Sequence, residues 1–181
     1  MPSRRTTIPV AAVLLSLAMP VTSARAQQEG EEPPPEPRSS LRVVGAAGLG
    51  DGALGTATVG GSVEGDLWGR GRPGALGLRF GGLAEGVGSD TAHGTLYGAG
   101  TFTAALHAGS GLFLATLAAG LADTRGEGFR GDASLGFLLS VRGAYLAPAG
   151  PIRLGIGVDV FTVPGLGAAL LASPMIDVPF F

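Results

Sequence analysis

The sequence contains no cysteine and no lysine, and only 6% of its residues are aromatic. Without cysteine, neither a disulfide framework nor a lipid-modified N-terminal cysteine can hold or anchor the chain. All 12 basic residues are arginines, and 14 acidic residues give a formal net charge of −2 at pH 7. We expect no nucleic-acid binding from an acidic chain of this kind. With two histidines and no cysteine, the sequence also predicts no metal site and no cofactor.

Residues 1–26 have the organisation of a secretory signal peptide. Two arginines precede the apolar run IPVAAVLLSLAM, and Ala24-Arg25-Ala26 forms an A-x-A cleavage motif after it. The alternative is a membrane anchor, but this run is too short to span a bilayer and it contains proline. The mature chain is therefore expected to begin at Gln27 with a formal charge of −5, because three arginines leave with the signal peptide.

Residues 27–40, QQEGEEPPPEPRSS, are acidic and rich in proline. Such a segment buries too little apolar surface to offset the entropy lost on ordering. We predict a disordered periplasmic leader. No specific motif supports the alternative, a segment that binds the cell wall or a partner.

The rest of the chain alternates between apolar and small or polar residues. The pattern is clearest from Phe129 to Val163, where two alternating runs flank the break APAGP. A period of two over about ten residues predicts a strand, and two such runs joined by a Pro/Gly turn predict a hairpin. Six further segments are expected to form strands. In the segment that starts at Leu112, both sets of alternate residues, or phases, are apolar. Taken alone, this segment is also compatible with a short buried helix.

Whether the apolar faces of these strands contact lipid or one another decides between a membrane barrel and a soluble fold. The chain is 45% hydrophobic, yet it has no apolar run of the roughly 18 residues that a membrane helix needs. Eight strands of about ten residues match the length that crosses a bilayer at a tilt. The sequence therefore predicts an all-β fold, an eight-stranded antiparallel up-and-down transmembrane β-barrel over residues 41–181. The alternative, a soluble exported β-sandwich, fits less well, because the polar faces are rich in glycine and alanine.

The charged residues are expected to face the lumen of this barrel. An eight-stranded barrel is just wide enough for its own side chains, so inward charges must be paired. Arginine suits such pairs, since its planar fork binds carboxylates and keeps its charge when buried. We therefore predict a structural network of ion pairs; the alternative is a path for protons or ions through the lumen. Arg142 and Arg153 are about equally far from the APAGP turn, so we expect them almost opposite one another. Its members are Arg42, Glu64, Asp66, Arg79, Glu85, Asp123, Arg130, Asp132, Arg142, Arg153 and Asp159.

With signal peptide, leader, eight alternating segments and an aromatic end, the chain resembles the small eight-stranded outer-membrane β-barrel proteins of Gram-negative bacteria. The family's C-terminal assembly signal is a terminal aromatic preceded by alternating hydrophobics, and Phe180 and Phe181 are its candidate residues here. The alternation holds counting back from Phe180, through Val178 and Ile176, but not from Phe181. Trp68, Tyr97 and Tyr145 are candidate anchors at the membrane interfaces. The resemblance implies a bacterial outer-membrane location in contact with lipid. It also implies assembly by periplasmic chaperones and the barrel-assembly machinery, and a monomeric state.

Fold alone does not choose a function for such a barrel. The leading hypothesis is a non-enzymatic structural or surface protein without an open pore. The alternative is an outer-membrane lipid hydrolase, similar to lipid A deacylases, with Ser89, Asp90 and His93 as nucleophile, acid and base. The simpler interpretation of that cluster is an ordinary polar turn. His107, the other histidine, is expected to pack in the lumen.

Overall fold

The computed structural model describes residues 38–50, 56–69, 74–86, 92–126, 133–163 and 167–180. The predicted signal peptide and most of the predicted leader lie outside these ranges. Within them, no helix has the length and apolar character needed to cross a membrane. The strands are β1 (Ser39–Gly50), β2 (Thr56–Trp68), β3 (Gly74–Glu85), β4 (His93–Ala108), β5 (Gly111–Arg125), β6 (Ala133–Ala149), β7 (Ile152–Val163) and β8 (Gly167–Phe180).

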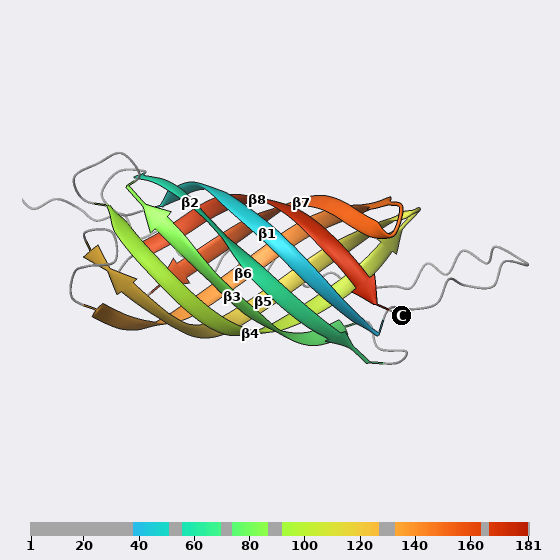
Figure 1. Ribbon diagram of the computed structural model, residues 1–181, viewed down its shortest axis with the longest axis horizontal. Helices are drawn as coiled ribbons and strands as arrows, with labels where there is room; N and C mark the ends of the chain where they lie inside the picture. Colours follow the sequence, from blue (N-terminus) through green and yellow to red (C-terminus); the bar gives the residue numbers. More distant parts are fainter. Residues whose placement is uncertain are drawn as a thin grey trace, which may run out of the picture. The chain divides into compact units, whose positions relative to one another are not determined.

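The eight strands form a closed antiparallel barrel, in which each strand pairs with its neighbours in sequence and β8 pairs with β1 (Figure 1). This confirms the prediction of an all-β, eight-stranded up-and-down barrel and excludes the β-sandwich. The segment that starts at Leu112 belongs to strand β5, because its backbone pairs with both β4 and β6. Strand β1 begins at Ser39, two residues before the expected start of the barrel, since Ser39 pairs with Leu67 and Phe180.

The strands are strongly staggered around the barrel. A path that follows cross-strand partners once around leaves β1 at Ser40 and returns to it at Gly50, ten residues farther along. In a barrel of eight strands, this stagger goes with a strand tilt of about 35–45° and an interior that side chains fill. The residues along the path are Ser40, Asp66, Gly77, Thr101, Ala118, Ser140, Phe161, Ala169 and Gly50.

Two tight turns mark one end of the barrel, which we call the turn end. Strands β4 and β5 are joined through Gly109 and Ser110, and strands β6 and β7 through Gly150 and Pro151. Both glycines have positive φ values, 60° and 69°, which the first position of a two-residue hairpin turn can require. The first residue of β1 and the last of β8 also lie at the turn end, and we call the opposite end the loop end.

Close contact between neighbouring strands makes Gly120 of β5 sensitive to substitution. A Cβ atom there would collide with the backbone of Gly98 and Ala99 on β4. We expect Gly120→Ala to lower the free energy of unfolding by about 1–3 kcal/mol, as overpacking does, measured by urea titration in detergent micelles. The matched control is Gly143→Ala, because a Cβ at Gly143 meets no atom within 4 Å. Equal losses from the two variants would show that the contact with β4 does not set the effect, since Gly→Ala without a clash is neutral to stabilising in a strand.

Candidate functional site

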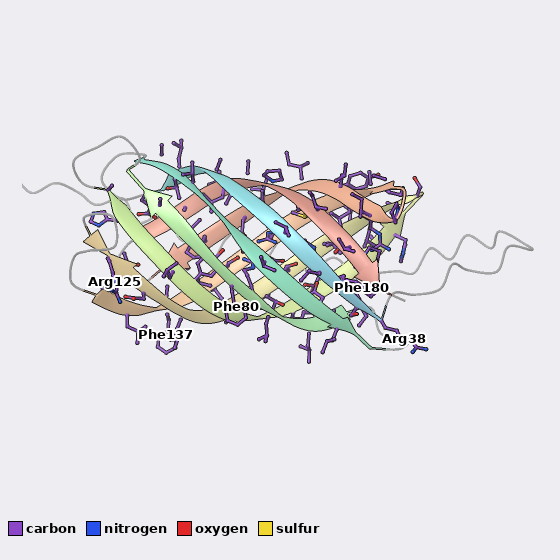
Figure 2. The ribbon with its side chains drawn as sticks, viewed as in Figure 1. Arg38, Phe80, Arg125, Phe137 and Phe180 are labelled. Atoms are coloured by element: carbon purple, nitrogen blue, oxygen red, sulfur yellow. The ribbon has the colours of Figure 1, made fainter. Side chains whose placement is uncertain are left out.

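Side chains on the strands alternate between the outer face and the lumen. Large apolar side chains cover the outer face, and Figure 2 shows Phe80 and Phe137 pointing away from the barrel. These two side chains are 61% and 74% exposed. The inner face instead holds arginine, carboxylate, hydroxyl and apolar side chains, most of them buried. The charged groups inside the barrel are therefore the candidate functional site.

Glu64 of β2 is the centre of the charged cluster, and it is 1% exposed. Its flanking cross-strand partners are Arg42 on β1 and Arg79 on β3. One carboxylate oxygen, Oε2, accepts a hydrogen bond from Arg42 Nη1 at 3.0 Å. The other, Oε1, lies 2.7 Å from Arg79 Nε and 2.6 Å from Arg142 Nη1. Because Arg142 comes from β6, this carboxylate ties strands on separate parts of the barrel together.

Asp159 of β7 forms the second centre. Arg142 is its direct cross-strand partner and donates to one carboxylate oxygen, Oδ2, from both Nη2 at 2.8 Å and Nε at 3.1 Å. Arg79 Nη1 donates to the same oxygen, Oδ2, at 3.1 Å, and Ser140 donates to Oδ1 at 2.6 Å. Arg79 and Arg142 therefore each bridge Glu64 and Asp159.

The cluster continues toward the turn end through Arg42. Its Nη2 donates to Asp66 Oδ2 at 2.9 Å, and its Nε lies 3.4 Å from Asp177 Oδ1. Asp177 also accepts from Arg153 Nη1 at 3.3 Å. The connected set contains four arginines and four carboxylates, so its charges balance. We call these eight residues the lumen network: Arg42, Glu64, Asp66, Arg79, Arg142, Arg153, Asp159 and Asp177.

Two apolar clusters occupy the remaining interior. Toward the loop end, Tyr97 and Phe161 pack with ring centroids 5.0 Å apart, together with Leu83, Leu138 and Leu171. Toward the turn end, a second cluster packs against Trp68 and Ala105; it contains Val44, Leu112, Leu114, Ala144, Leu146 and Met175. The lumen thus has a charged centre with apolar packing toward both ends.

Asp123 is a correction to the predicted network. It is the cross-strand partner of Leu96, whose side chain is exposed on the outer face, and so it lies in the outward phase of β5. Its partner is Arg125, with Oδ2 2.9 Å from Nη2, and both side chains are partly exposed. The error arose because β5 is apolar in both phases, so alternation does not fix which face Asp123 occupies.

The other predicted members have different positions. Glu85, the last residue of β3, lies in the inward phase at the loop end, opposite His93, and is half-buried. Arg130 and Asp132 lie outside the described residues. Asp177 was missed by the sequence analysis. Counting back from Phe180 in steps of two gives the outward residues Val178 and Ile176, which leaves Asp177 between them in the inward phase.

The expected position of Arg153 opposite Arg142 is also wrong. The register pairs Arg142 with Asp159 and Arg153 with Pro148, because Gly150 and Pro151 form a tight turn that fixes the pairing of β6 with β7. The two arginines are therefore separated along the barrel, and Arg142 contacts Asp159 on β7 and Glu64 across the lumen. Arg153 instead binds Asp177 at the turn end.

The aromatic anchors divide between the two faces. Tyr145 is partly exposed on the outer face, with its ring 4.9 Å from that of Phe113. Tyr97 is buried in the lumen, and Trp68 packs against the apolar cluster at the turn end, with its Nε1 3.5 Å from Ser40 Oγ. Trp68 and Tyr97 are therefore inward packing residues, which corrects their expected place at the membrane interfaces.

The predicted hydrolase cluster is described in part. His93 is the exposed first residue of β4, whereas Ser89 and Asp90 lie outside the described residues. His107 lies near the turn end of β4 and is exposed, so its expected packing in the lumen is wrong. At the C-terminus, Phe180 is exposed on the outer face and pairs with Ser39; Phe181 lies outside the described residues.

A closed eight-stranded antiparallel barrel with an apolar outer face and a charged interior is the architecture of small outer-membrane β-barrels. The solved structures bear out this resemblance. The chain superposes on Neisserial surface protein A with a TM-score of 0.66 and 10% sequence identity, covering 78% of this chain and 97% of that one. No protein-family model and no curated protein matches the sequence.

Two further solved structures share the fold. Ail, the attachment invasion locus protein of Yersinia pestis, has a TM-score of 0.55 at 10% identity, covering 80% of this chain and 99% of that one. The outer membrane enzyme PagL has a TM-score of 0.53 at 18% identity, covering 77% and 99%. These likenesses concern the fold. Because they include an enzyme and proteins named for the cell surface or attachment, the fold does not choose an activity.

Proposed function

We propose that the protein is an integral outer-membrane β-barrel with a closed lumen and a structural or surface role. The observation that carries this proposal is the burial of the inward side chains. Arg79 and Thr103 are 0% exposed, and Glu64 is 1% exposed. In a water-filled pore, the inward side chains would be open to solvent along the whole passage. This barrel has side-chain packing there instead.

The outer face supports the membrane location. Large hydrophobic side chains are exposed on all eight strands, which in water would be an unusually large apolar surface. At the loop end, the apolar face gives way to the ion pair between Asp123 and Arg125. An outward-facing apolar band is what a membrane-spanning barrel presents to lipid. Assembly by chaperones and the barrel-assembly machinery, and a monomeric state, stay predictions.

The lumen network has a structural role in this proposal. Its four positive and four negative charges balance, and each carboxylate contacts at least one guanidinium. Burial of unpaired ions is costly, whereas a paired and hydrogen-bonded group can be nearly neutral in free energy. An ion path would instead need charged groups in contact with water along the whole lumen, whereas Arg79 and Glu64 at its centre are buried.

A conductance measurement tests the closed lumen. The purified full-length chain, inserted into planar lipid bilayers, is expected to give no stable conductance steps, because buried side chains block the passage. A large porin in the same bilayers is the positive control, and a heat-modifiability gel on the reconstituted sample verifies that the barrel is folded. Regular conductance steps from the folded protein would contradict the proposal.

The second candidate, an outer-membrane lipid hydrolase, has no specific structural support beyond a shared fold. The described part of its predicted cluster is His93, which has Glu85 as its cross-strand partner. A lipid A deacylation assay on the wild-type chain and on His93→Ala separates the two candidates. Activity that is lost in His93→Ala would replace the structural role with an enzymatic one.

A further inference from the structure

The seam that closes the barrel, between β1 and β8, is interrupted on the outer face. Pairing runs from Ser39 to Val44 on β1, stops at Gly45 and Ala46, and resumes at Ala47. Opposite the gap lies Pro174, which has no N–H group to donate. On its other side, β8 stays paired with β7 through this stretch, since Ile156 pairs with Pro174. The break is therefore confined to the closing seam.

A hollow of about 390 Å³ lies beside this break. Gly45 belongs to the outward phase and has no side chain to cover the gap, while the neighbouring outward side chains stand around it. The hollow opens outward, because Val43, Leu154 and Ile176 are all exposed on the outer face. Its lining consists mainly of Val43 and Gly45 of β1, Leu154 of β7, and Pro174, Met175 and Ile176 of β8.

The chemistry of the lining selects the ligand. None of these side chains carries a charge or a hydrogen-bonding group apart from the weakly accepting thioether of Met175. Polar groups at the hollow come only from the backbone, such as the Pro174 carbonyl, so a polar ligand would lose more hydration there than it regains. An empty apolar hollow, in turn, forfeits dispersion contacts along its walls. We propose that the hollow at the β1–β8 seam binds one acyl chain of a membrane lipid. This inference rests on the proposed membrane location, which surrounds the hollow with hydrocarbon.

A second copy of the chain fits the hollow less well. A stable protein interface buries about 800 Å² on each partner, far more than a hollow with so few lining residues can offer. Another barrel would present a convex outer wall, which would rest on the exposed rim residues Val43 and Leu154 and leave the hollow unfilled. A flexible acyl chain can enter it and contact Gly45 and Pro174 directly.

Photo-crosslinking tests the acyl-chain site. The full-length chain is reconstituted in vesicles of phosphatidylethanolamine and phosphatidylglycerol that contain a phosphatidylcholine with a diazirine midway along one acyl chain. After irradiation, mass spectrometry locates the labelled residues. We expect labelling of Val43–Gly45 and Pro174–Ile176 to exceed that of Leu76–Phe80, on the outer face of β3, several-fold.

Two variants fill the hollow, each with a matched control on another part of the outer face. Gly45→Met is compared with Gly65→Met, because a Cβ at Gly45 lies 3.2 Å from Pro174 Cγ whereas one at Gly65 meets nothing within 4 Å. Should Gly45→Met fail to fold, Leu154→Phe compared with Leu78→Phe makes the same test. The filling variants are expected to reduce labelling at the seam several-fold, and their controls to leave it unchanged.

Each outcome decides between the alternatives. Three outcomes would overturn the acyl-chain site. The first is labelling that follows only the exposure of each outer-face residue, and the second is unchanged labelling in a folded filling variant. The third is crosslinking between two copies of the seam. In these three cases the membrane location stands, because lipid still labels the outer face. Protein that folds but stays outside the vesicles would overturn the proposed function and, with it, this inference.

Discussion

Glu64→Gln is expected to lower the free energy of unfolding by about 3–5 kcal/mol, the range found when one partner of a buried ion pair is removed. Glutamine keeps the shape of the side chain, so the loss comes from charge. In the wild type, the carboxylate lies within 3.0 Å of guanidinium nitrogens from Arg42, Arg79 and Arg142. Without it, three arginines share fewer carboxylates in a region closed to water. Urea titration in detergent micelles, followed by heat-modifiability gels, measures the loss.

The matched control is Asp123→Asn, which makes the same change from carboxylate to amide at a partly exposed ion pair. Exposed pairs contribute about 0–1 kcal/mol, so we expect little effect. A double variant, Glu64→Gln with Arg142→Gln, is expected to lose less than the sum of its single changes, because it removes charges of both signs. If Glu64→Gln costs no more than Asp123→Asn, water reaches the lumen freely and the closed-lumen proposal fails.

The sequence was sufficient to predict the class of fold and the inward position of most charges. In a strand, alternate residues face opposite sides, so only the side that each set of residues occupies has to be assigned. Where charged residues recur in one set, that set is assigned to the lumen. Glu64 and Asp66 illustrate this on β2, where Val63 and Leu67 occupy the opposite phase. On β5 both phases are apolar, so the face of Asp123 could not be read from the pattern.

The partners within the lumen network could not be predicted, because they depend on register and stagger. Arg142 meets Asp159 since a two-residue turn fixes the pairing of β6 with β7. Its contact with Glu64 crosses the interior, and no local pattern encodes which strands face each other there. Asp177 was accessible to sequence reasoning, but its proline-containing strand hid the alternation. The interrupted seam at Pro174 is likewise visible only once β1 and β8 are placed together.

Phe80→Arg is expected to lower the free energy of unfolding by about 2–4 kcal/mol, as arginine does when it faces lipid near the middle of a bilayer. Phe80 lies near the middle of β3, and its side chain points outward (Figure 2). Neighbouring outward side chains on β2 and β3 are also apolar, so the new guanidinium finds no carboxylate. Urea titration of the protein folded into phospholipid vesicles measures the effect.

The comparison with Phe137→Arg separates a lipid effect from a simple loss of aromatic packing. Phe137 is exposed to a similar degree, but it lies near the loop end of β6, two residues from Leu135, the cross-strand partner of Asp123. An arginine there can reach the polar interface, where the same substitution costs about 0–1 kcal/mol. Both variants lose a phenylalanine from the outer face, so packing alone predicts similar losses. A large loss at Phe80 and a small one at Phe137 would trace the depth of hydrocarbon around the barrel, whereas a loss of only about 0–1 kcal/mol at Phe80 would mean that the outer face there does not contact the bilayer core.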